Sequence, residues 1–235
     1  MRKLLTAFFL VLSASVIAQE SSVKATLSRI FIEIPDSCFS LLTHTLPDSI
    51  TINKAGRKSL IDTLQVIDTW YPVLHFTSFD TVHRYLWLLA KEGEPEGMTA
   101  QIAYWNCTDG TRLVMMTVNY SDICVLEQRA RYFWIDNGIQ LVPVKEAELF
   151  PSISNKKFIK AAFLKKHKTA NKNKMPYMLL RGDNENAVSY VPALDYLFAC
   201  ADSFKDNSWY GLERKDFVRD ELLLYWNGTR FTARK

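Results

Sequence analysis

The chain has 235 residues, of which 48% are hydrophobic, 13% aromatic and 23% charged, and its formal net charge is +4. This composition excludes a disordered chain, and a chain of this length buries roughly 70% of its unfolded surface on folding, enough for a sizeable core. Without Arg2 and Lys3, which lie in a predicted signal peptide, 27 basic residues remain against 25 acidic ones. The resulting charge of +2 identifies no partner and is too small for a typical nucleic-acid-binding protein.

The first 18 residues have the three parts of a cleavable secretory signal. Two basic residues precede an apolar run over residues 4–12, and the small-residue ending Val16-Ile17-Ala18 follows. A buried N-terminal helix fits less well, because polar residues follow at 19–22. We therefore predict that residues 1–18 are removed and that the mature chain, residues 19–235, is exported to the periplasm or the extracellular space. A lipoprotein is not expected because no cysteine stands at the cleavage point, and no mature segment has the ~20 apolar residues of a membrane span.

Helical patterns dominate the first part of the mature chain. An apolar run over residues 30–34 ends at Pro35, and Asp36 or Ser37 can then cap a short helix. A second helix is predicted over residues 57–68, where apolar residues recur on one face.

A third helix is predicted to begin at Thr77 and Asp80, which have the spacing of a capping box. Its apolar positions recur at helical intervals and are Val82, Tyr85, Leu86 and Leu89. The loop over residues 92–97 ends it.

From Thr99 the pattern changes to that of an antiparallel β-meander. Strands are predicted over residues 101–106, 113–120, 124–135 and 139–144. The turns between them contain Asp109-Gly110 and Asn137-Gly138, which supply the positive backbone angles of tight hairpins.

Helix returns over residues 155–168, with apolar residues on one side and lysines on the other. Short strands follow at 177–180 and 188–191, and a hairpin closes the chain, turning at Asn227-Gly228. The fold class is therefore α+β: an antiparallel sheet of meander hairpins packed against several amphipathic helices. We expect one domain over residues 19–235. Its two sub-blocks, 19–150 and 151–235, are candidates for related helix-plus-meander halves, because each has an aromatic strand ending in Asn-Gly.

Four cysteines, Cys38, Cys107, Cys124 and Cys200, remain in the mature chain. An exported protein can keep disulfides, and three pairings are possible. Cys107 and Cys124 flank a predicted strand and are a candidate disulfide, whereas buried free thiols are the alternative. Since no Cys-x-x-Cys spacing occurs, neither a zinc site nor thioredoxin-type redox chemistry is expected.

The most unusual feature of the composition is a lysine tract that begins in the predicted helix over residues 155–168. Its candidate polyanion-binding residues are Lys156, Lys157, Lys160, Lys165, Lys166 and Lys168. A one-sided cationic surface attracts polymers that carry phosphate, sulfate or carboxylate groups, which for an exported protein means a glycan rather than DNA. The alternative is the solvated face that any amphipathic helix needs.

Motifs for catalysis, metals and nucleotides are missing from the chain. There is no Gly-x-Ser-x-Gly elbow, no Ser-x-x-Lys pair and no phosphate-binding glycine loop. His75, Asp80 and His83 could form a small polar cluster, but their spacing does not suit zinc. No cofactor, no metal site and no catalytic residue is therefore predicted.

Three pieces of sequence resemble an uncharacterised family of small secreted proteins from Gram-negative, gut-type bacteria. They are Ile34-Pro35-Asp36-Ser37 with Leu41-Leu42-Thr43, then Arg57-Lys58-Ser59-Leu60-Ile61-Asp62, then Thr117-Val118 followed by Cys124, Arg129 and Tyr132-Phe133-Trp134. The resemblance covers residues 30–145 and departs from the family in a long spacer after Leu42 and in having only Cys124 of a usual cysteine pair. It implies export and an α+β fold, and it assigns no activity.

The leading hypothesis is an exported, non-catalytic binding or interaction protein whose partner is an anionic glycan or an envelope protein. One alternative is a secreted hydrolase of a cell-wall or dietary polymer that uses acids such as Asp122, Glu127 or Asp136, since glycoside hydrolysis needs only a carboxylate pair. Another is an inhibitor of a secreted hydrolase, with the loop over residues 92–97 as its inserting segment.

Overall fold

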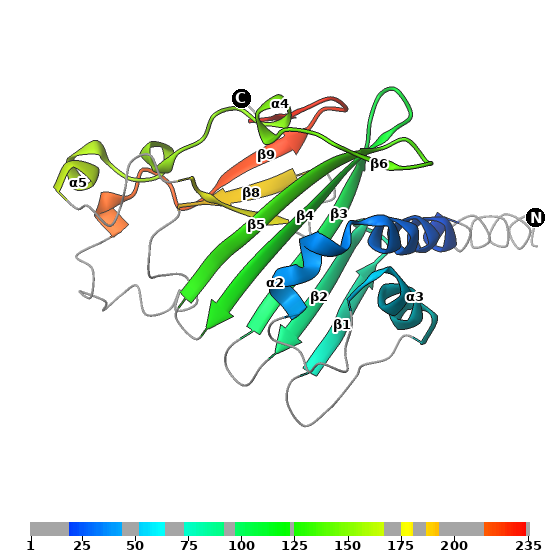
Figure 1. Ribbon diagram of the computed structural model, residues 1–235. Coiled ribbons are helices and arrows are strands. Elements are labelled where there is room, and N and C mark those ends of the chain that lie inside the picture. Colours follow the sequence, from blue (N-terminus) through cyan, green and yellow to red (C-terminus); the bar gives the residue numbers. More distant parts are fainter. Residues whose placement is uncertain are drawn as a thin grey trace, which may run out of the picture.

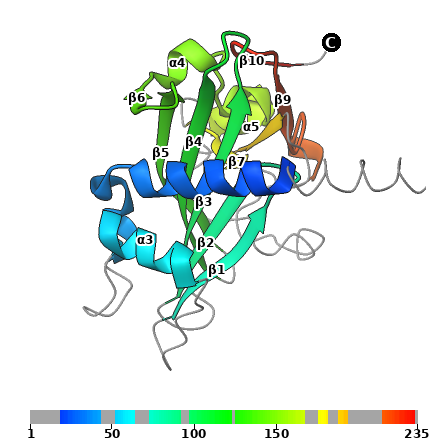
Figure 2. The ribbon, with the colours of Figure 1, turned by 90° about the vertical axis from the view of Figure 1, so that its right-hand side faces the viewer.

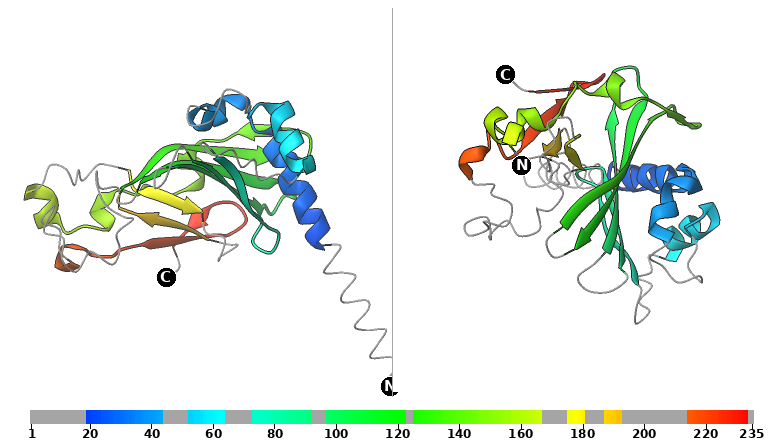
Figure 3. Two further views of the ribbon diagram at one scale, coloured as in Figure 1. Left: turned by 90° about the horizontal axis from the view of Figure 1, so that it is seen from below. Right: turned by 60° about the vertical axis from the view of Figure 1, so that its left-hand side comes forward.

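The computed structural model describes residues 19–43, 52–63, 73–91, 97–122, 125–166, 175–180, 187–192 and 214–233. These residues form three layers (Figure 1). Helices from the first part of the chain cover one face of a six-stranded sheet, and a four-stranded sheet packs on the opposite side (Figure 3). The α+β class and the antiparallel meander are confirmed.

Both sheets are simple meanders in which every strand pairs antiparallel with its neighbours. The six-stranded sheet contains, in spatial order, β1 (Val73–Asp80), β2 (Tyr85–Lys91), β3 (Gly97–Asn106), β4 (Arg112–Asp122), β5 (Val125–Asp136) and β6 (Leu141–Pro143). The four-stranded sheet has the order β10-β9-β8-β7 and contains β7 (Tyr177–Leu180), β8 (Ala187–Val191), β9 (Leu222–Trp226) and β10 (Phe231–Thr232).

Helical segments are mostly short. The longest described one covers residues 19–33. The others are η1 (Asp36–Phe39), α2 (Ser40–Thr43), α3 (Lys54–Thr63), α4 (Glu146–Leu149), η2 (Asn155–Lys157), α5 (Ala161–Lys166) and η5 (Arg214–Asp216). The predicted helix after Pro35 is thus confirmed as η1 and α2, and the predicted second helix begins three residues earlier, at Lys54, where Asn53 caps it by accepting a 2.8 Å hydrogen bond from the Gly56 amide. Its predicted end, residue 68, lies outside the described residues.

The six-stranded sheet is buried on both faces, which gives the protein two cores. Val114, Met116 and Val118 of β4 point toward the helices, whereas Leu113 and Met115 point toward the four-stranded sheet. All five side chains are completely buried. Because the period of a strand is two, a single strand can supply both cores at once.

The helix over residues 19–33 lies across the first face of the sheet (Figure 2). Val23, Leu27, Ile30 and Phe31 recur three or four residues apart and are buried against the sheet. The apolar run at residues 30–34 is therefore the end of a longer helix, whose described part includes the polar residues at 19–22.

Arg57, a buried residue of the first core, caps the C-terminal end of this helix. Its side chain is 1% exposed and donates to the carbonyl oxygens of Phe31, Ile32, Ile34 and Ile52 at 2.5–2.8 Å and to Asp36 Oδ1 at 2.7 Å. The last carbonyls of a helix have no partner within it, so one guanidinium here supplies what a C-terminal cap would. The guanidinium also lies over the Phe39 ring, 4.6 Å from its centre.

The predicted third helix is wrong. Residues 73–91 form the hairpin of β1 and β2, with a turn at residues 81–84. The apolar positions that fit a helical period also fit a strand buried on both sides, because Leu86 and Leu88 face the first core while Tyr85 and Trp87 face the second. Asp80 begins the turn rather than a helix, and its Oδ1 accepts a hydrogen bond from the His83 amide.

The single helix predicted over residues 155–168 is divided. Phe158 and Ile159 are buried between η2 and α5, where Ile159 forms an antiparallel β-bridge with Phe217. This bridge takes residue 159 out of a helical conformation and ties the segment to the chain that precedes β9. Phe163 is buried as predicted, whereas Ala162 is exposed.

The candidate disulfide is not supported. Cys107 is a free cysteine at the end of β3, and Cys124 lies outside the described residues. Asp122 and Val125, the described residues on either side of Cys124 in the sequence, pair at the end of β4 that is opposite to Cys107. An eleven-residue strand separates the two ends, far more than the ~7 Å limit between Cα atoms in a disulfide.

Three tight turns share one local design. In the turns after β3, β5 and β9, a side-chain oxygen of Asp109, Asn137 or Asn227 accepts the amide two residues later. A glycine follows each of these residues with φ between +85° and +98°. The Asn-Gly turns that suggested related halves are therefore alike in geometry, although turn chemistry alone explains that likeness.

The turns after β3 and β9 touch, and this contact joins the two sheets. The Thr108 amide donates to the Gly228 carbonyl at 3.1 Å, and the Trp226 indole donates to the Asn106 carbonyl at 2.7 Å. A Cβ atom on Gly228 would lie 2.5 Å from Thr108 Cγ2, whereas one on Gly138 would meet nothing within 4 Å.

We expect Gly228→Ala to lower the free energy of unfolding by about 1–2 kcal/mol more than Gly138→Ala does. Both substitutions place an alanine at a positive φ, but only the first also forces Thr108 away. Urea unfolding of the two variants measures the difference, and adding Thr108→Ala to Gly228→Ala should remove part of it. Equal losses in the two variants would contradict a tight contact between the turns.

The outer edge of β7 is occupied by a side chain rather than by another strand. Gln128 of β5 donates to the Met178 carbonyl at 2.6 Å and accepts from the Met178 amide at 3.0 Å. It also donates to Asn119 of β4 at 2.9 Å, so the same side chain contacts both sheets.

Candidate functional site

The lysine tract lies at one end of the molecule, around α5 (Figure 3). Lys156 and Lys157 belong to η2, Lys160 follows, and Lys165 and Lys166 form the last turn of α5. All five are exposed, and we call them the lysine face. Lys168 lies outside the described residues.

The buried neighbours of the lysines explain their exposure. Phe158, Ile159 and Phe163 fill the second core, so the residues between them face solvent. The segment before β9 fixes this arrangement, because the Lys160 amide donates to the Asp216 carbonyl at 2.9 Å and the Val218 amide to the Phe158 carbonyl at 2.7 Å.

The lysine face carries five positive charges that are not neutralised by described acids. No described Asp or Glu lies within ion-pair distance of any of its ammonium groups. The segment before β9 adds the exposed Lys215 and Arg219 beside it, together with Asp216 and Asp220. Flexible, strongly hydrated ammonium groups suit repeated anionic charges more than one shaped ligand.

The acids suggested for a hydrolase do not form a pair. Glu127 is ion-paired with Arg129 at 2.9 Å near one end of β5, whereas Asp136 is the last residue of the same strand. Nine residues of strand separate them, roughly 30 Å, and the carboxylates of a glycosidase lie less than about 10 Å apart. Asp122 ends β4 opposite Val125, and its side chain is outside the description.

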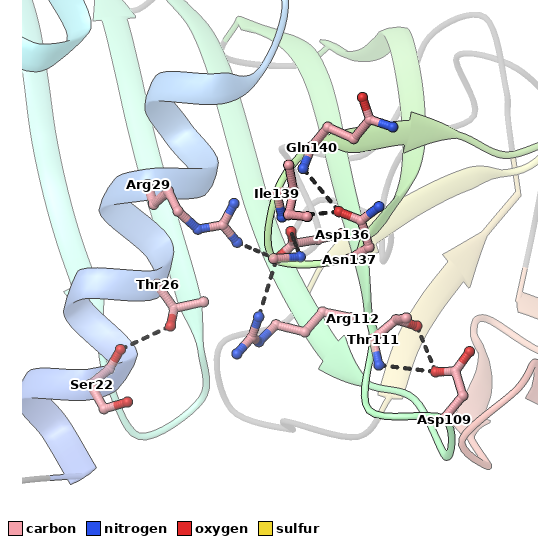
Figure 4. A network of polar contacts seen from close by, with 11 residues as sticks. Ser22, Thr26, Arg29, Asp109, Thr111, Arg112, Asp136, Asn137, Ile139 and Gln140 are labelled. Carbon is pink, nitrogen blue, oxygen red and sulfur yellow. Dashed lines mark hydrogen bonds and ion pairs between the residues drawn. The ribbon is translucent and has the colours of Figure 1, made fainter.

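Asp136 is instead the buried centre of a polar network (Figure 4). Its side chain is completely buried, its Oδ1 accepts the Gly138 amide at 2.9 Å, and its Oδ2 accepts from Arg29 and, at 3.3 Å, from Arg112. Arg29 comes from the helix over residues 19–33 and Arg112 from β4. The network therefore attaches the N-terminal helix to the end of the sheet.

Tyr104 lies beside this network. The guanidinium carbons of Arg84 and Arg112 are 5.8 and 5.9 Å from the centre of its ring. Burial raises the pKa of Tyr104, although the two arginines and a hydrogen bond with Thr26 oppose this effect. The phenol therefore stays neutral at physiological pH and is suited to hydrogen bonding rather than to acid-base chemistry.

Two of the three residues of the suggested histidine cluster come together. His83 Nδ1 lies 2.6 Å from Asp80 Oδ2 in the β1–β2 turn. Burial raises the pKa of Asp80, but the side-chain and backbone hydrogen bonds from His83 outweigh it and lower the pKa overall. The backbone of His75, five residues from Asp80 along β1, pairs with Leu89 of β2, and the side chain of His75 lies outside the description. Asp80 and His83 together stabilise the turn.

A second polar network lies between the sheets. Arg131 donates to Glu146 at 2.8 Å and to the Pro176 carbonyl at 2.9 Å, and the Tyr190 hydroxyl donates to Glu146 at 3.3 Å. Burial, followed by the nearby Glu146 carboxylate, raises the pKa of Tyr190. These contacts hold β7 and β8 against β5.

Among the described residues, no group of three His, Cys, Asp or Glu side chains could hold a metal ion. Within the same residues, no helix has the length and apolar character required to cross a membrane.

Comparison with known proteins leaves the family open. No family model matches the chain, and no curated protein matches it. Among solved structures, a domain of an uncharacterized protein from Porphyromonas gingivalis W83 aligns at 12% sequence identity, over 88% of this chain and 97% of that one, with a TM-score of 0.49.

The sequence pattern did not identify the arginines around Tyr104 and Asp136. Arg29, Arg84, Arg112 and Asp136 come from four distant parts of the chain, so no local spacing connects them. Arg57 did occur in one of the family-like pieces, and the structure joins it to Asp36 of another.

Proposed function

We propose that this protein is an exported, non-catalytic binding module that holds an anionic glycan of the cell envelope or extracellular space on the lysine face. The observation that supports this most directly is the cluster of five exposed lysines, none of which is paired with a described acid. Such a surface attracts a chain of regularly spaced sulfate, phosphate or carboxylate groups.

The glycan is favoured over nucleic acid by the proposed compartment. Export rests on the basic start, the apolar run and the small-residue ending of residues 1–18. Membership of the exported family rests on the three pieces of sequence named above. Arg57 and Asp36, which belong to two of these pieces, form an ion pair in the structure.

We expect the variant Lys160→Glu/Lys165→Glu/Lys166→Glu to bind a sulfated polysaccharide such as heparin at least about tenfold more weakly than the wild type. Each substitution removes one attraction and adds one repulsion. Biolayer interferometry on immobilised heparin and polygalacturonate, with neutral dextran as a blank, measures the affinity. Binding should weaken steeply between 50 and 300 mM salt, roughly the range in which screening becomes strong.

The matched control is Lys58→Glu/Lys145→Glu/Arg230→Glu. These three residues are also exposed, and the variant has the same net charge as the first one. It should keep most of the affinity if the lysine face is the binding site. Equal weakening of both variants would show a general charge effect, and no binding of any anionic polymer by the wild type would refute the proposal.

A further inference from the structure

Three arginines from separate elements lie around Tyr104 and Asp136 at one end of the six-stranded sheet: Arg84 and Arg112 are beside Tyr104, and Arg29 and Arg112 are beside Asp136. Arg29 comes from the helix over residues 19–33, Arg84 from the β1–β2 turn and Arg112 from the start of β4. The guanidinium carbons of Arg84 and Arg112 lie 5.8 and 5.9 Å from the centre of the Tyr104 ring. Arg29 and Arg112 share one oxygen of Asp136 (Figure 4). We call Arg29, Arg84 and Arg112 the arginine cluster.

The charges of this cluster do not balance. Among the described residues, Asp136 is the one acid that forms an ion pair with the cluster, and it pairs with Arg29 and Arg112, so the three guanidinium groups and this carboxylate together carry a charge of +2. Both oxygens of Asp136 already accept hydrogen bonds: Oδ1 from the Gly138 amide and Oδ2 from Arg29 and Arg112. Two acids close in sequence to the cluster, Asp109 before Arg112 and Asp80 before Arg84, bind Thr111 and His83 within their own turns.

One donor of the cluster is buried without an acceptor. Arg29 Nη1 is inaccessible to solvent and has no hydrogen-bond partner among the described residues. Buried polar groups are almost always hydrogen-bonded, and a charged one without a partner is costly. Arg29 therefore has one hydrogen-bond donor without a described acceptor, and its side chain as a whole is 33% exposed.

The backbone of Arg84 is strained. Among the described residues it is the one non-glycine residue with a positive φ, +58°. Glycine or asparagine would occupy this conformation more easily, so the arginine side chain is kept at a conformational cost. Strain of this kind is common where a side chain has a binding role.

We propose that the arginine cluster binds one phosphate or sulfate group, with Tyr104 as the floor of the site. Guanidinium groups pair with tetrahedral oxyanions through several parallel hydrogen bonds, and a local charge of +2 matches a dianion. The group is either a free inorganic ion or an ester carried by a sugar. The proposal does not rest on the lysine face, which lies around α5 and shares no residue with this site.

The test is a titration of isotope-labelled protein with sodium phosphate and with sodium sulfate, at an ionic strength kept constant with sodium chloride. The arginine Nε–Hε signals of the cluster should shift in a saturable manner. Arg84→Gly should weaken the binding of phosphate at least about tenfold without lowering the melting temperature, because glycine accepts the positive φ. Arg84→Gln gives a second variant with a side chain of similar length, and Arg230→Gln, at an exposed arginine elsewhere, should leave the affinity unchanged.

Glucose 6-phosphate and glucose 6-sulfate extend the test. Tighter binding of either ester than of its inorganic ion would assign the ligand to a modified sugar, and equal binding would assign the free ion. No saturable shift of the cluster signals with any of the four compounds would overturn the proposal, as would an Arg84→Gly affinity within twofold of the wild type. Binding of polygalacturonate, which carries carboxylates but no phosphate or sulfate, should not change in Arg84→Gly, so the two proposals can fail independently.

Discussion

Arg57→Met should lower the free energy of unfolding by about 3–5 kcal/mol, because three buried carbonyl oxygens lose their hydrogen-bond donor. The substitution keeps most of the apolar volume but leaves Asp36 and the carbonyls of Phe31, Ile32, Ile34 and Ile52 without their donor. Buried acceptors that lose their partner cost about 1–3 kcal/mol each before the structure relaxes. Urea unfolding followed by circular dichroism measures the loss.

Lys58→Met is the matched control, because Lys58 is the next residue in α3 and is exposed. It should change stability by less than about 0.5 kcal/mol. Arg57→Lys should be intermediate, since a lysine keeps the charge but cannot present the planar fork that reaches five oxygens. A loss below 1 kcal/mol for Arg57→Met would contradict the capping role.

Phe231→Ala should also cost about 3–5 kcal/mol, the usual range for truncating a fully buried phenylalanine. The ring is completely buried, stacks on Phe150 at 4.7 Å between centroids and contacts Trp105 and Trp226 at 5.2 and 5.0 Å. Its removal leaves a cavity where the two sheets meet.

Tryptophan fluorescence distinguishes loss of this contact from a general loss of packing. Trp105 and Trp226 should become more solvated in Phe231→Ala, with a shift of emission to longer wavelength. Ile139→Ala is the control: Ile139 is 87% exposed and should tolerate truncation with no measurable change. A wild-type spectrum in Phe231→Ala would show that Phe231 does not hold the sheets together.

The parts of the fold that local chemistry determines could be predicted from sequence. Asn-Gly and Asp-Gly turns with alternating strands between them determined the meander, because few other structures accept those turn residues at those positions. The hairpin of β1 and β2 was missed since both of its faces are buried. Leu86 and Leu88 form one continuous apolar run with Tyr85 and Trp87, so apolar and polar residues do not alternate along the strand.

The helix over residues 19–33 shows the opposite case. Val23, Leu27, Ile30 and Phe31 have helical spacing, but polar residues lie between them. Only the apolar run at the end of the helix was therefore predicted. The division of the lysine-bearing helix had no local signal, because it follows from the bridge of Ile159 with Phe217, 58 residues later.

The lysine face and the arginine cluster also differ in how far the sequence predicts them. Exposure of the lysine face followed from its amphipathic pattern, whereas the arginine cluster depends on which strands and helices become neighbours. Arg29, Arg84, Arg112 and Asp136 come to the same end of the sheet only when the chain folds.

The amide of Gln128 has a consequence for behaviour at high concentration. An outer strand with free amide and carbonyl groups recruits strands of other molecules and so promotes aggregation. On β7, the Gln128 side chain occupies both backbone groups of Met178 as a neighbouring strand would. One residue of the larger sheet thus occupies this edge of the four-stranded sheet and opposes edge-to-edge association with other molecules.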